Sequence, residues 1–321
     1  MSILDAIIQG IVQGLTEFLP VSSSGHLAIT QHILGSGGES NLFFNVMLHV
    51  GTLVAVVAFY YKLIWSLIKE LFSMIKDIFT GKFKWSQMNY ERNLIMMLII
   101  GLIPLFLLFL PIPGTDMKIK DIADIISESP ILLATGISLL LTSVLLFVGI
   151  SFNKRNCNRK QKLKYLRGAN GISASGKESY NALDAILVGL TQLCAALLPG
   201  LSRSGSTLAV GEMRGINKQK ALDFTFVLGI PSILAAALLE GVDAIKSPQG
   251  INVDPIVLIV GIIVSAVVGY LSIVIFKWFL KSDKMSIFVI YTAIVGIAIT
   301  IISLVEMNTG VNLFTGAPIN I

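Results

Sequence analysis

The sequence predicts an all-α polytopic membrane protein, with six transmembrane helices and two re-entrant helical hairpins arranged as an inverted repeat. Of its 321 residues, 54% are hydrophobic and only 13% are charged, and its mean hydropathy is +0.81. Soluble globular proteins are far less apolar, so this composition indicates a chain that lies mostly in lipid. Six apolar stretches are long enough to cross a bilayer, and one segment occurs twice, starting at Leu4 and again at Leu183.

The repeated segment reads LDAIIQGIVQGLTEFLP in its first copy and LDAILVGLTQLCAALLP in its second. In both copies the final Pro leads into a stretch rich in Ser and Gly. Pro interrupts a helix, and non-helical backbone at membrane depth is tolerated only where it is buried in protein or lines a cavity. The duplication therefore predicts a site formed by its two copies. The positions identical in register are Leu4/Leu183, Asp5/Asp184, Ala6/Ala185, Ile7/Ile186, Gly10/Gly189, Gln13/Gln192, Leu19/Leu198 and Pro20/Pro199.

Each copy is expected to form two half-helices, because its apolar stretches are shorter than the roughly 20 residues that a bilayer requires. The half-helices are predicted over 3–19 and 27–34 in the first copy, and over 183–198 and 205–213 in the second. Two half-helices that enter and leave on the same face form a re-entrant hairpin.

Six full spans are predicted, and three of them separate the two hairpins. An odd number of crossings places the second hairpin on the opposite face, so the duplication is expected to be inverted. We therefore expect one integral membrane domain with two repeats, 1–152 and 182–321, each a hairpin plus three spans, joined by a cytoplasmic basic loop over 153–181. The predicted spans are 42–61, 94–113, 131–152, 221–239, 256–276 and 285–305.

The basic residues predict the orientation in the cell membrane, because Lys and Arg accumulate in cytoplasmic loops. Lys and Arg are frequent in 62–92, 153–181 and 277–284, whereas 114–130 and 240–255 carry more acidic than basic residues. Both termini and the first hairpin are therefore expected on the outside. This distribution also explains the net charge of +5 without a nucleic-acid partner.

The first copy carries a carboxylate at membrane depth. Gln13 and Glu17 are spaced by four residues and so share one helix face. A carboxylate there is costly and is usually functional, although it could also only pair with a neighbour. After Pro20, the residues Ser22, Ser23, Ser24, Gly25 and His26 open the next half-helix, where free backbone N–H groups favour an anion. Simple capping by the serines is the alternative.

The second copy has an arginine in the equivalent turn, Ser202-Arg203-Ser204, followed by Gly205 and Thr207. The guanidinium of Arg203 suits phosphate oxygens, although a plain ion pair with Glu17 would also satisfy it. Together the two copies describe a site for a phosphate group carried by a lipid. Glu17, with Gln13, offers oxygen ligands to a divalent cation such as Mg²⁺ or Ca²⁺, and the chemistry implied is phosphoryl transfer to water.

These motifs resemble those of the undecaprenyl-diphosphate phosphatases of the bacitracin-resistance type, and the resemblance covers essentially the whole chain. That family removes the terminal phosphate of undecaprenyl diphosphate to regenerate the lipid carrier for cell-wall glycans, uses a divalent cation and opens its site to the outside. Gln13 stands where many members have Glu, which removes one charge from the metal site. The first motif is matched by Gln13, Glu17, Pro20, Ser22, Ser23, Gly25 and His26, and the second by Pro199, Gly200, Ser202, Arg203, Ser204 and Thr207.

The resemblance implies that Glu17 is a metal-binding or catalytic carboxylate and that Arg203 binds the diphosphate. Ser23 and His26 are nucleophile candidates, and water assisted by either is the third possibility. His49 is expected to be a packing or hydrogen-bonding residue. The residues expected to bind substrate are Gln13, Ser22, Gly25, Ser202, Ser204 and Thr207.

Two other functions fit parts of the pattern. An inverted-repeat transporter or flippase for a phosphorylated lipid or an anion shares the architecture, but it does not require a His, a Ser cluster and a Glu together. A scaffolding protein leaves Glu17 and Arg203 without a role. The expected partners are therefore the polyprenyl diphosphate and membrane lipid, with a homodimer as the assembly to test.

Overall fold

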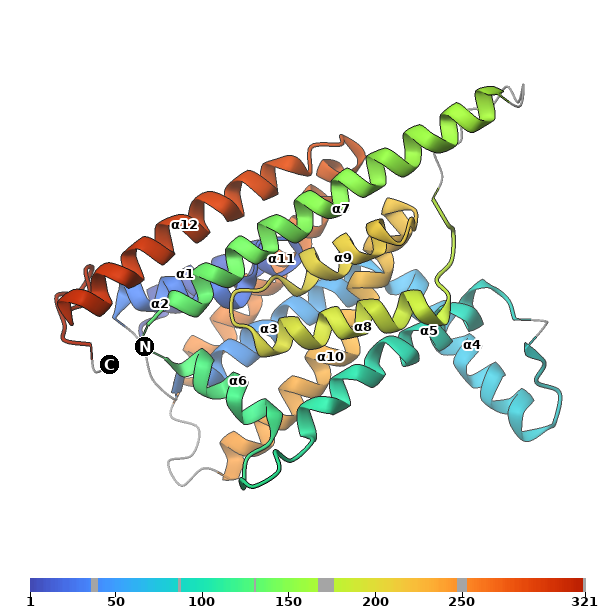
Figure 1. The fold of residues 1–321 in the computed structure, drawn as a ribbon. Helices are drawn as coiled ribbons and strands as arrows, with labels where there is room; N and C mark the ends of the chain where they lie inside the picture. The colour runs from blue at the N-terminus through green and yellow to red at the C-terminus, as the bar shows by residue number, and fades with distance from the viewer. Residues whose placement is uncertain (36–39, 86–87, 130, 167–175, 247–252, 320–321) are drawn as a thin grey trace.

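The computed structural model describes all residues except 36–39, 86–87, 130, 167–175, 247–252 and 320–321. The described residues form helices and no strand, which confirms the all-α class (Figure 1). In chain order the elements are α1 Ile3–Phe18, α2 Ser23–Leu34, α3 Ser40–Phe59, α4 Tyr61–Phe79, α5 Tyr90–Leu102, the 3₁₀ helix η2 Ile103–Phe109, α6 Ile119–Glu128, α7 Leu133–Leu166, α8 Ala182–Leu197, α9 Arg203–Met213, α10 Lys218–Lys246, α11 Pro255–Lys281 and α12 Ser286–Thr309.

The four predicted half-helices are present as α1, α2, α8 and α9. Capping boxes start the first helix of each pair: Ser2 accepts a hydrogen bond from the backbone of Asp5, and Asn181 accepts one from Asp184. Each first helix ends one residue before the Leu that precedes the Pro, because Pro disfavours helical backbone in the residue before it. Both copies of the duplicated segment thus fold as two short helices with a break between them.

Within the described residues, five segments are long and apolar enough to cross a membrane: Tyr90–Phe109, Leu133–Arg155, Lys218–Leu239, Pro255–Lys281 and Ser286–Thr309. A sixth is obtained if α3 and α4 are counted together as one bent segment. The chain is therefore a multi-pass membrane protein.

Several predicted boundaries are wrong. The helix α6, Ile119–Glu128, lies in the expected loop 114–130, and α10 continues to Lys246 instead of ending at 239; two further differences are larger. The region 62–92 was expected to be a loop, but α4 occupies most of it, at an angle of 84° to α3. The helix α7 continues to Leu166 instead of ending at 152, because the polar residues that suggested a loop also have good helix propensity. Both errors have one cause: a polar sequence ends an apolar span without necessarily ending a helix.

The helices of the two halves interdigitate instead of forming two separate bundles. The first helix of the first copy, α1, packs against α11, and the first helix of the second copy, α8, packs against α5. In the duplicated order, α5 and α11 are corresponding spans. The corresponding pairs α3 with α10 and α7 with α12 also contact each other. Most helices of the first half, α4 excepted, therefore pack against helices of the second half.

Close backbone contacts at glycines hold these helices together. A Cβ atom on Gly14 of α1 would stand 2.8 Å from the backbone nitrogen of Gly269 in α11. A Cβ atom on Gly189 of α8 would overlap the carbonyl oxygen of Gly101 in α5 and stand 2.9 Å from Cγ of Pro104. Small residues that let backbones approach closely are typical of membrane helix pairs.

We expect Gly189→Ala to destabilise the folded protein by about 1–3 kcal/mol, because the added methyl meets backbone atoms that cannot move alone. Thermal unfolding of the purified protein in detergent measures this. Gly241→Ala in α10 is the matched control, since a Cβ atom at that position would have no neighbour within 4 Å. Equal melting temperatures for both variants would contradict the close α5–α8 contact.

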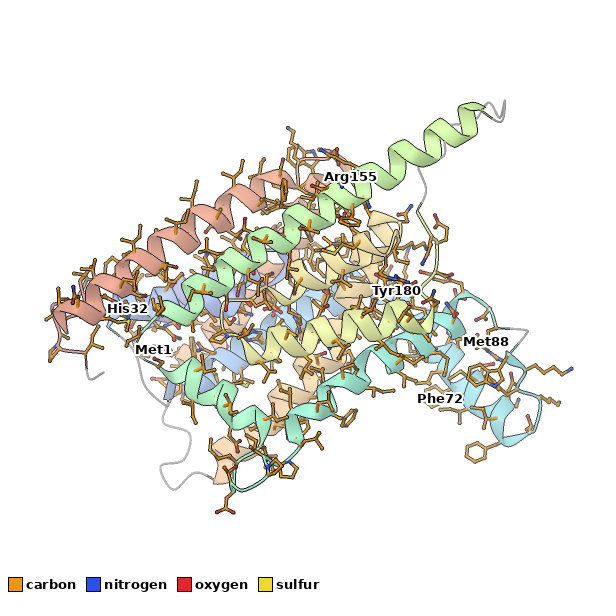
Figure 2. The ribbon with its side chains drawn as sticks, viewed as in Figure 1. Met1, His32, Phe72, Met88, Arg155 and Tyr180 are labelled. Carbon is orange, nitrogen blue, oxygen red and sulfur yellow. The ribbon has the colours of Figure 1, made fainter. Side chains whose placement is uncertain are left out.

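The two ends of the helical bundle carry different parts of the chain. Figure 2 places Met1 and His32 at one end, and Phe72, Met88 and Tyr180 at the other. The break loop that follows α8 lies between these ends (Figure 1), and residues of both breaks are buried, namely Val21, Ser22, Leu201 and Ser202.

Candidate active site

The two breaks place serine caps at equivalent positions. Ser22 caps α2 and Ser202 caps α9, and each hydroxyl accepts a hydrogen bond from the backbone N–H of the glycine three residues later. Ser23 and Arg203 therefore occupy the first helical position of α2 and α9 respectively. Capping leaves the other N–H groups of each first turn available to a ligand.

The two break loops contact each other reciprocally. A Cβ atom on Gly25 would stand 3.0 Å from Cα of Gly200, and one on Gly205 would stand 3.0 Å from Cβ of Pro20. Gly25, near the start of α2, thus packs on the break that follows α8. Gly205, near the start of α9, packs on the break that follows α1. This contact brings the starts of α2 and α9 together in one place.

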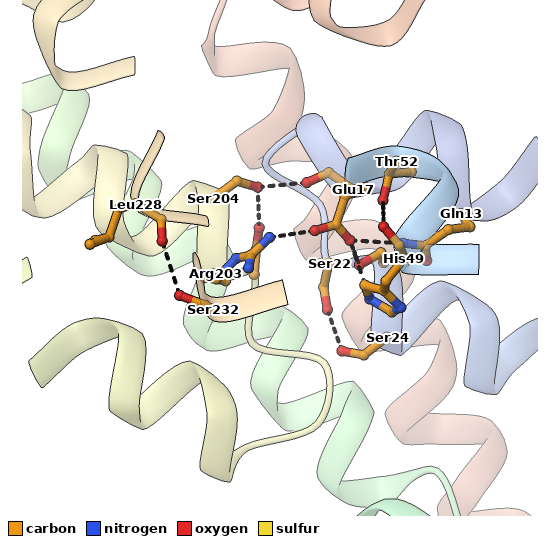
Figure 3. Close-up of polar contacts among 12 residues, drawn as sticks. Gln13, Glu17, Ser22, Ser24, His49, Thr52, Arg203, Ser204, Leu228 and Ser232 are labelled. Atoms are coloured by element: carbon orange, nitrogen blue, oxygen red, sulfur yellow. Dashed lines mark hydrogen bonds and ion pairs between the residues drawn. The ribbon is translucent and has the colours of Figure 1, made fainter. Parts of the chain in front are cut away.

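Glu17 is the centre of the polar contacts in Figure 3. Its Oε2 accepts hydrogen bonds from the hydroxyl of Ser23 at 2.6 Å and from the amide of Gln13 at 2.9 Å, and it lies 3.4 Å from Nε2 of His49. Its Oε1 accepts a hydrogen bond from the guanidinium of Arg203. The ion pair between Glu17 and Arg203 thus joins the two copies, and a serine hydroxyl rests on the same carboxylate.

A cavity of about 350 Å³ opens beside this cluster. The side chains of Glu17 and Gln192 in its wall are almost fully buried, and Arg203 is about a quarter exposed. The predicted residues that line it are Glu17, Ser22, Ser23, Ser202, Arg203 and Ser204.

The rest of the cavity wall is mostly apolar. It comes from α3, from η2, from the end of α8 and from the second half of α10. Two of its members, Phe109 and Leu239, are 41% and 42% exposed, so this wall reaches the surface of the bundle. The apolar lining residues are Val46, Leu105, Leu108, Phe109, Ala195, Ala196, Leu201, Ile233, Ala235, Ala236 and Leu239.

Three predicted residues lie behind the cavity wall. Gln13 is fully buried and donates to Glu17, so it fixes the orientation of that carboxylate. Gly25 provides the close contact between the break loops. Thr207 donates to the carbonyl oxygen of Arg203 at 2.8 Å and to the hydroxyl of Thr225 at 3.2 Å. None of the three is among the residues that line the cavity.

His26 does not line the cavity. Its Nδ1 donates to the carbonyl oxygen of Ser22 at 2.8 Å, and its Nε2 accepts from the hydroxyl of Tyr291 on α12 at 2.7 Å. The imidazole also stacks on the Tyr291 ring. Because both ring nitrogens are engaged, His26 holds the Ser22–Ser23 turn in place in this structure.

Besides the apolar lining, three polar cavity residues outside the two break motifs were not in the predicted site. His49 faces Glu17 while its Nδ1 donates to the carbonyl oxygen of Asn45 at 2.8 Å. Gln192 and Ser232 line the opposite wall and contact each other at 3.4 Å. The register of the duplication, which pairs Gln192 with Gln13, was the signal that could have revealed Gln192. His49 and Ser232 come from α3 and α10, whose rotation about their own axes the sequence does not give.

The oxygens of Glu17 and Gln13 are of the type that a hard divalent cation binds. Oε1 of Gln13 is buried and has no hydrogen-bond partner, which suits an atom that would bind a cation together with the Glu17 carboxylate. Among the described residues no group of three His, Cys, Asp or Glu side chains could hold a metal ion. Mg²⁺ needs no such group, because it commonly takes one or two protein oxygens and completes its shell with phosphates and water.

Comparison with known proteins identifies the family of the chain. Residues 6–298 match the family described as bacitracin resistance protein BacA. A protein of Bacteroides thetaiotaomicron named undecaprenyl-diphosphatase is 37% identical over 308 residues, covering 95% of this chain and 100% of the relative. Relatives of the same name from Alkaliphilus metalliredigens and Geotalea daltonii are 37% and 32% identical, covering 95% and 97% of this chain and 100% of each relative. The chain therefore belongs to the bacitracin resistance protein BacA family.

Proposed function

We propose that this protein hydrolyses undecaprenyl diphosphate, or a closely similar polyprenyl diphosphate, to the monophosphate and inorganic phosphate. The product is the lipid carrier on which cell-wall glycans are built, and its regeneration accounts for the resistance to bacitracin in the family name. One observation carries the proposal: a serine hydroxyl and an arginine meet on one buried carboxylate, beside a cavity that is polar on one side and apolar on the other.

The carboxylate of Glu17 supports Ser23 as the nucleophile. Their 2.6 Å hydrogen bond lets Glu17 take the hydroxyl proton as Ser23 Oγ attacks the terminal phosphorus. The Oγ–P bond forms and the bond from phosphorus to the bridging oxygen breaks, so the polyprenyl monophosphate leaves as an anion without needing a proton. Water then attacks the phosphorus of the phosphoserine, and its O–P bond forms as the Oγ–P bond breaks. Glu17 returns its proton to Ser23 Oγ, and the protons of the water stay on the released phosphate. His26 lacks a free ring nitrogen for attack.

Arg203 and two helix ends stabilise the phosphate charge. The guanidinium keeps donors free beyond its bond to Glu17, and Arg is suited to bidentate contact with phosphate. The first turns of α2 and α9 meet at the cavity and bring two positive helix ends to the same place. These donors are fixed before the substrate binds, which makes them effective in the transition state.

The apolar wall suits the isoprenoid chain of the substrate. It includes Leu105, Leu108 and Phe109 of η2 and Ile233 and Leu239 of α10, and it reaches the surface of the bundle at Phe109 and Leu239. A polyprenyl chain in this position would stay in an apolar environment while its diphosphate contacts Arg203. A soluble diphosphate, which has no isoprenoid chain, would not bury apolar surface against this wall.

We expect hydrolysis to require a divalent cation. When bound by Glu17 and Gln13, such a cation neutralises phosphate charge. EDTA should reduce phosphate release at least about 100-fold, and Mg²⁺ or Ca²⁺ should restore it. Gln13→Leu should shift the Mg²⁺ concentration for half-activation upward. Full activity in EDTA, after removal of bound metal is verified by elemental analysis, would contradict this site.

The proposed architecture is an inverted repeat of 1–152 and 182–321, with six transmembrane helices, two re-entrant hairpins and the active site facing outside. The reciprocal packing of α1 on α11 and of α8 on α5 supports it, as do the reciprocal glycine contacts between the break loops. The predominance of Lys and Arg at the ends assigned to the cytoplasm supports the orientation.

Cysteine labelling in intact cells tests the orientation. In a chain carrying Cys157→Ser and Cys194→Ser, we expect a membrane-impermeant maleimide to label Asp116→Cys and not Glu178→Cys, since both positions are exposed and the proposal puts them on opposite sides. Permeabilised cells should show labelling of both variants. The reverse pattern in intact cells would place the active site toward the cytoplasm.

Hydrolysis separates the proposal from a transporter of the same architecture. Purified protein with Mg²⁺ should release equimolar phosphate and undecaprenyl monophosphate from undecaprenyl diphosphate, and should act much more slowly on inorganic diphosphate. Folded protein that leaves the lipid intact while moving it between leaflets would establish the transporter instead.

A further inference from the structure

The helix α4, Tyr61–Phe79, presents three different faces. Leu63, Leu67 and Met74 lie on the face that packs into the core against its neighbours. A second, polar face turns toward α5, where Arg92 donates to Glu70 at 2.6 Å and to Asp77 at 2.7 Å. The acidic residues of α4 are thus neutralised by its own bundle. The third face is the exposed one, and its side chains are 39% to 87% exposed.

The third face is apolar and strongly exposed. It is formed by six side chains spaced alternately by four and three residues, the spacing that places them on one side of a helix. Phe72 and Phe79 are 68% and 87% exposed. Phe72 projects outward at the end of the bundle in Figure 2. The six side chains are Tyr61, Trp65, Ile68, Phe72, Ile75 and Phe79.

Three lysines run along one edge of this apolar face. Lys62, Lys69 and Lys76 recur every seven residues, so they form a row beside it. All three are exposed, and within the described residues none has a carboxylate partner. The ammonium groups of Lys62 and Lys69 instead lie over the rings of Tyr61 and Trp65, at 5.8 and 5.3 Å.

The direction of α4 matches a membrane surface. It leaves the apolar helix α3 at 84°, so if α3 crosses the bilayer, α4 lies close to the membrane plane where that crossing ends. In this position the apolar face with its Trp and Tyr would enter the boundary of the acyl chains, and the lysine row would lie at the level of the phosphates.

We propose that α4 is an interfacial helix that binds anionic phospholipid head groups of the leaflet at its end of the bundle. The apolar face inserts at the boundary of the acyl chains. The lysine row, which has no carboxylate partner among the described residues, gives the preference for anionic lipid. This surface is separate from the substrate cavity, since no residue of α4 lines that cavity. The alternative occupant of this apolar face is a second copy of the chain, which would pack the same face of its own α4 against it.

Lipid retention tests the lysine row. We would reconstitute the full chain in phosphatidylcholine nanodiscs containing a minority of phosphatidylglycerol and measure the enrichment of phosphatidylglycerol around the protein by mass spectrometry. Because each lysine near an anionic surface contributes about a fivefold preference, K62Q/K69Q/K76Q should reduce the enrichment at least about tenfold. The triple variant K154Q/K281Q/K284Q removes the same charge from exposed residues elsewhere, and should keep the enrichment.

Fluorescence tests the apolar face. A chain with Trp85→Phe and Trp278→Phe keeps only Trp65, whose emission should be quenched by phosphatidylcholine brominated near the head-group end of its acyl chains. Equal loss of enrichment in both lysine variants, or no loss in either, would overturn the proposal. So would a Trp65 that bromolipid does not quench, or efficient crosslinking of Phe72→Cys between two copies in a chain lacking Cys157 and Cys194.

Discussion

Replacing Ser23 by Ala should lower the rate of undecaprenyl diphosphate hydrolysis at least about 10⁴-fold, because it removes the attacking oxygen while leaving the cavity intact. Glu17→Gln should have a similar effect, since the amide cannot take the proton of Ser23. The two losses should not add in the double variant, because both residues serve one step. Steady-state phosphate release by purified protein measures all three.

The control for Ser23→Ala is a buried serine with no access to the cavity. Ser272 on α11 donates to the carbonyl oxygen of Leu15 at 2.8 Å and is fully buried. Ser272→Ala should keep nearly full activity and lose only about 1 kcal/mol of stability. Activity of Ser23→Ala close to that of the unmodified chain would exclude Ser23 as nucleophile and return the choice to His26 or water.

Replacing Arg203 should produce the second large loss. Arg203→Ala removes the phosphate contact, and we expect a fall in kcat/KM of at least about 10³-fold. Arg203→Lys keeps the charge but not the planar pair of donors, so it should recover only a small part of that loss. Steady-state kinetics of both variants at saturating Mg²⁺ distinguish the effect of the positive charge of Arg203 from the effect of its planar pair of donors.

A second arginine–carboxylate pair provides the matched control. Arg214 donates from Nε to Asp184 at 2.6 Å, and neither residue lines the cavity. Arg214→Lys should therefore alter stability more than turnover. An Arg203→Lys variant that is fully active would show that Arg203 serves only as the counter-ion of Glu17.

The duplication made the positions of the half-helices predictable. Pro20 and Pro199 end α1 and α8 through local backbone sterics, which do not depend on the rest of the fold. The expectation that Glu17 and Arg203 meet also needed little tertiary information, because a buried arginine requires an anion and few were available. The ion pair between Arg203 and Glu17 is present in the structure.

The orientation of the histidines could not be predicted in the same way. His26 lies one turn into α2, close in sequence to Ser23, yet Tyr291 of α12 holds its ring away from the cavity. His49 was expected to be a packing or hydrogen-bonding residue, and it does hydrogen-bond to Asn45, but the rotation of α3 also brings it to Glu17. Such rotations depend on contacts between distant helices. The helix α4 was missed for another reason, since its lysines resembled a loop although its apolar residues recur with helical spacing.

The most direct test of the proposed mechanism is a rapid-quench single turnover with undecaprenyl diphosphate labelled in its terminal phosphate. If Ser23 attacks, label should appear on the protein before free phosphate, peptide mapping should locate it on Ser23, and it should be absent from Ser23→Ala. Free phosphate that forms at the full rate with no labelled protein at any time, or label found on His26, would contradict the mechanism.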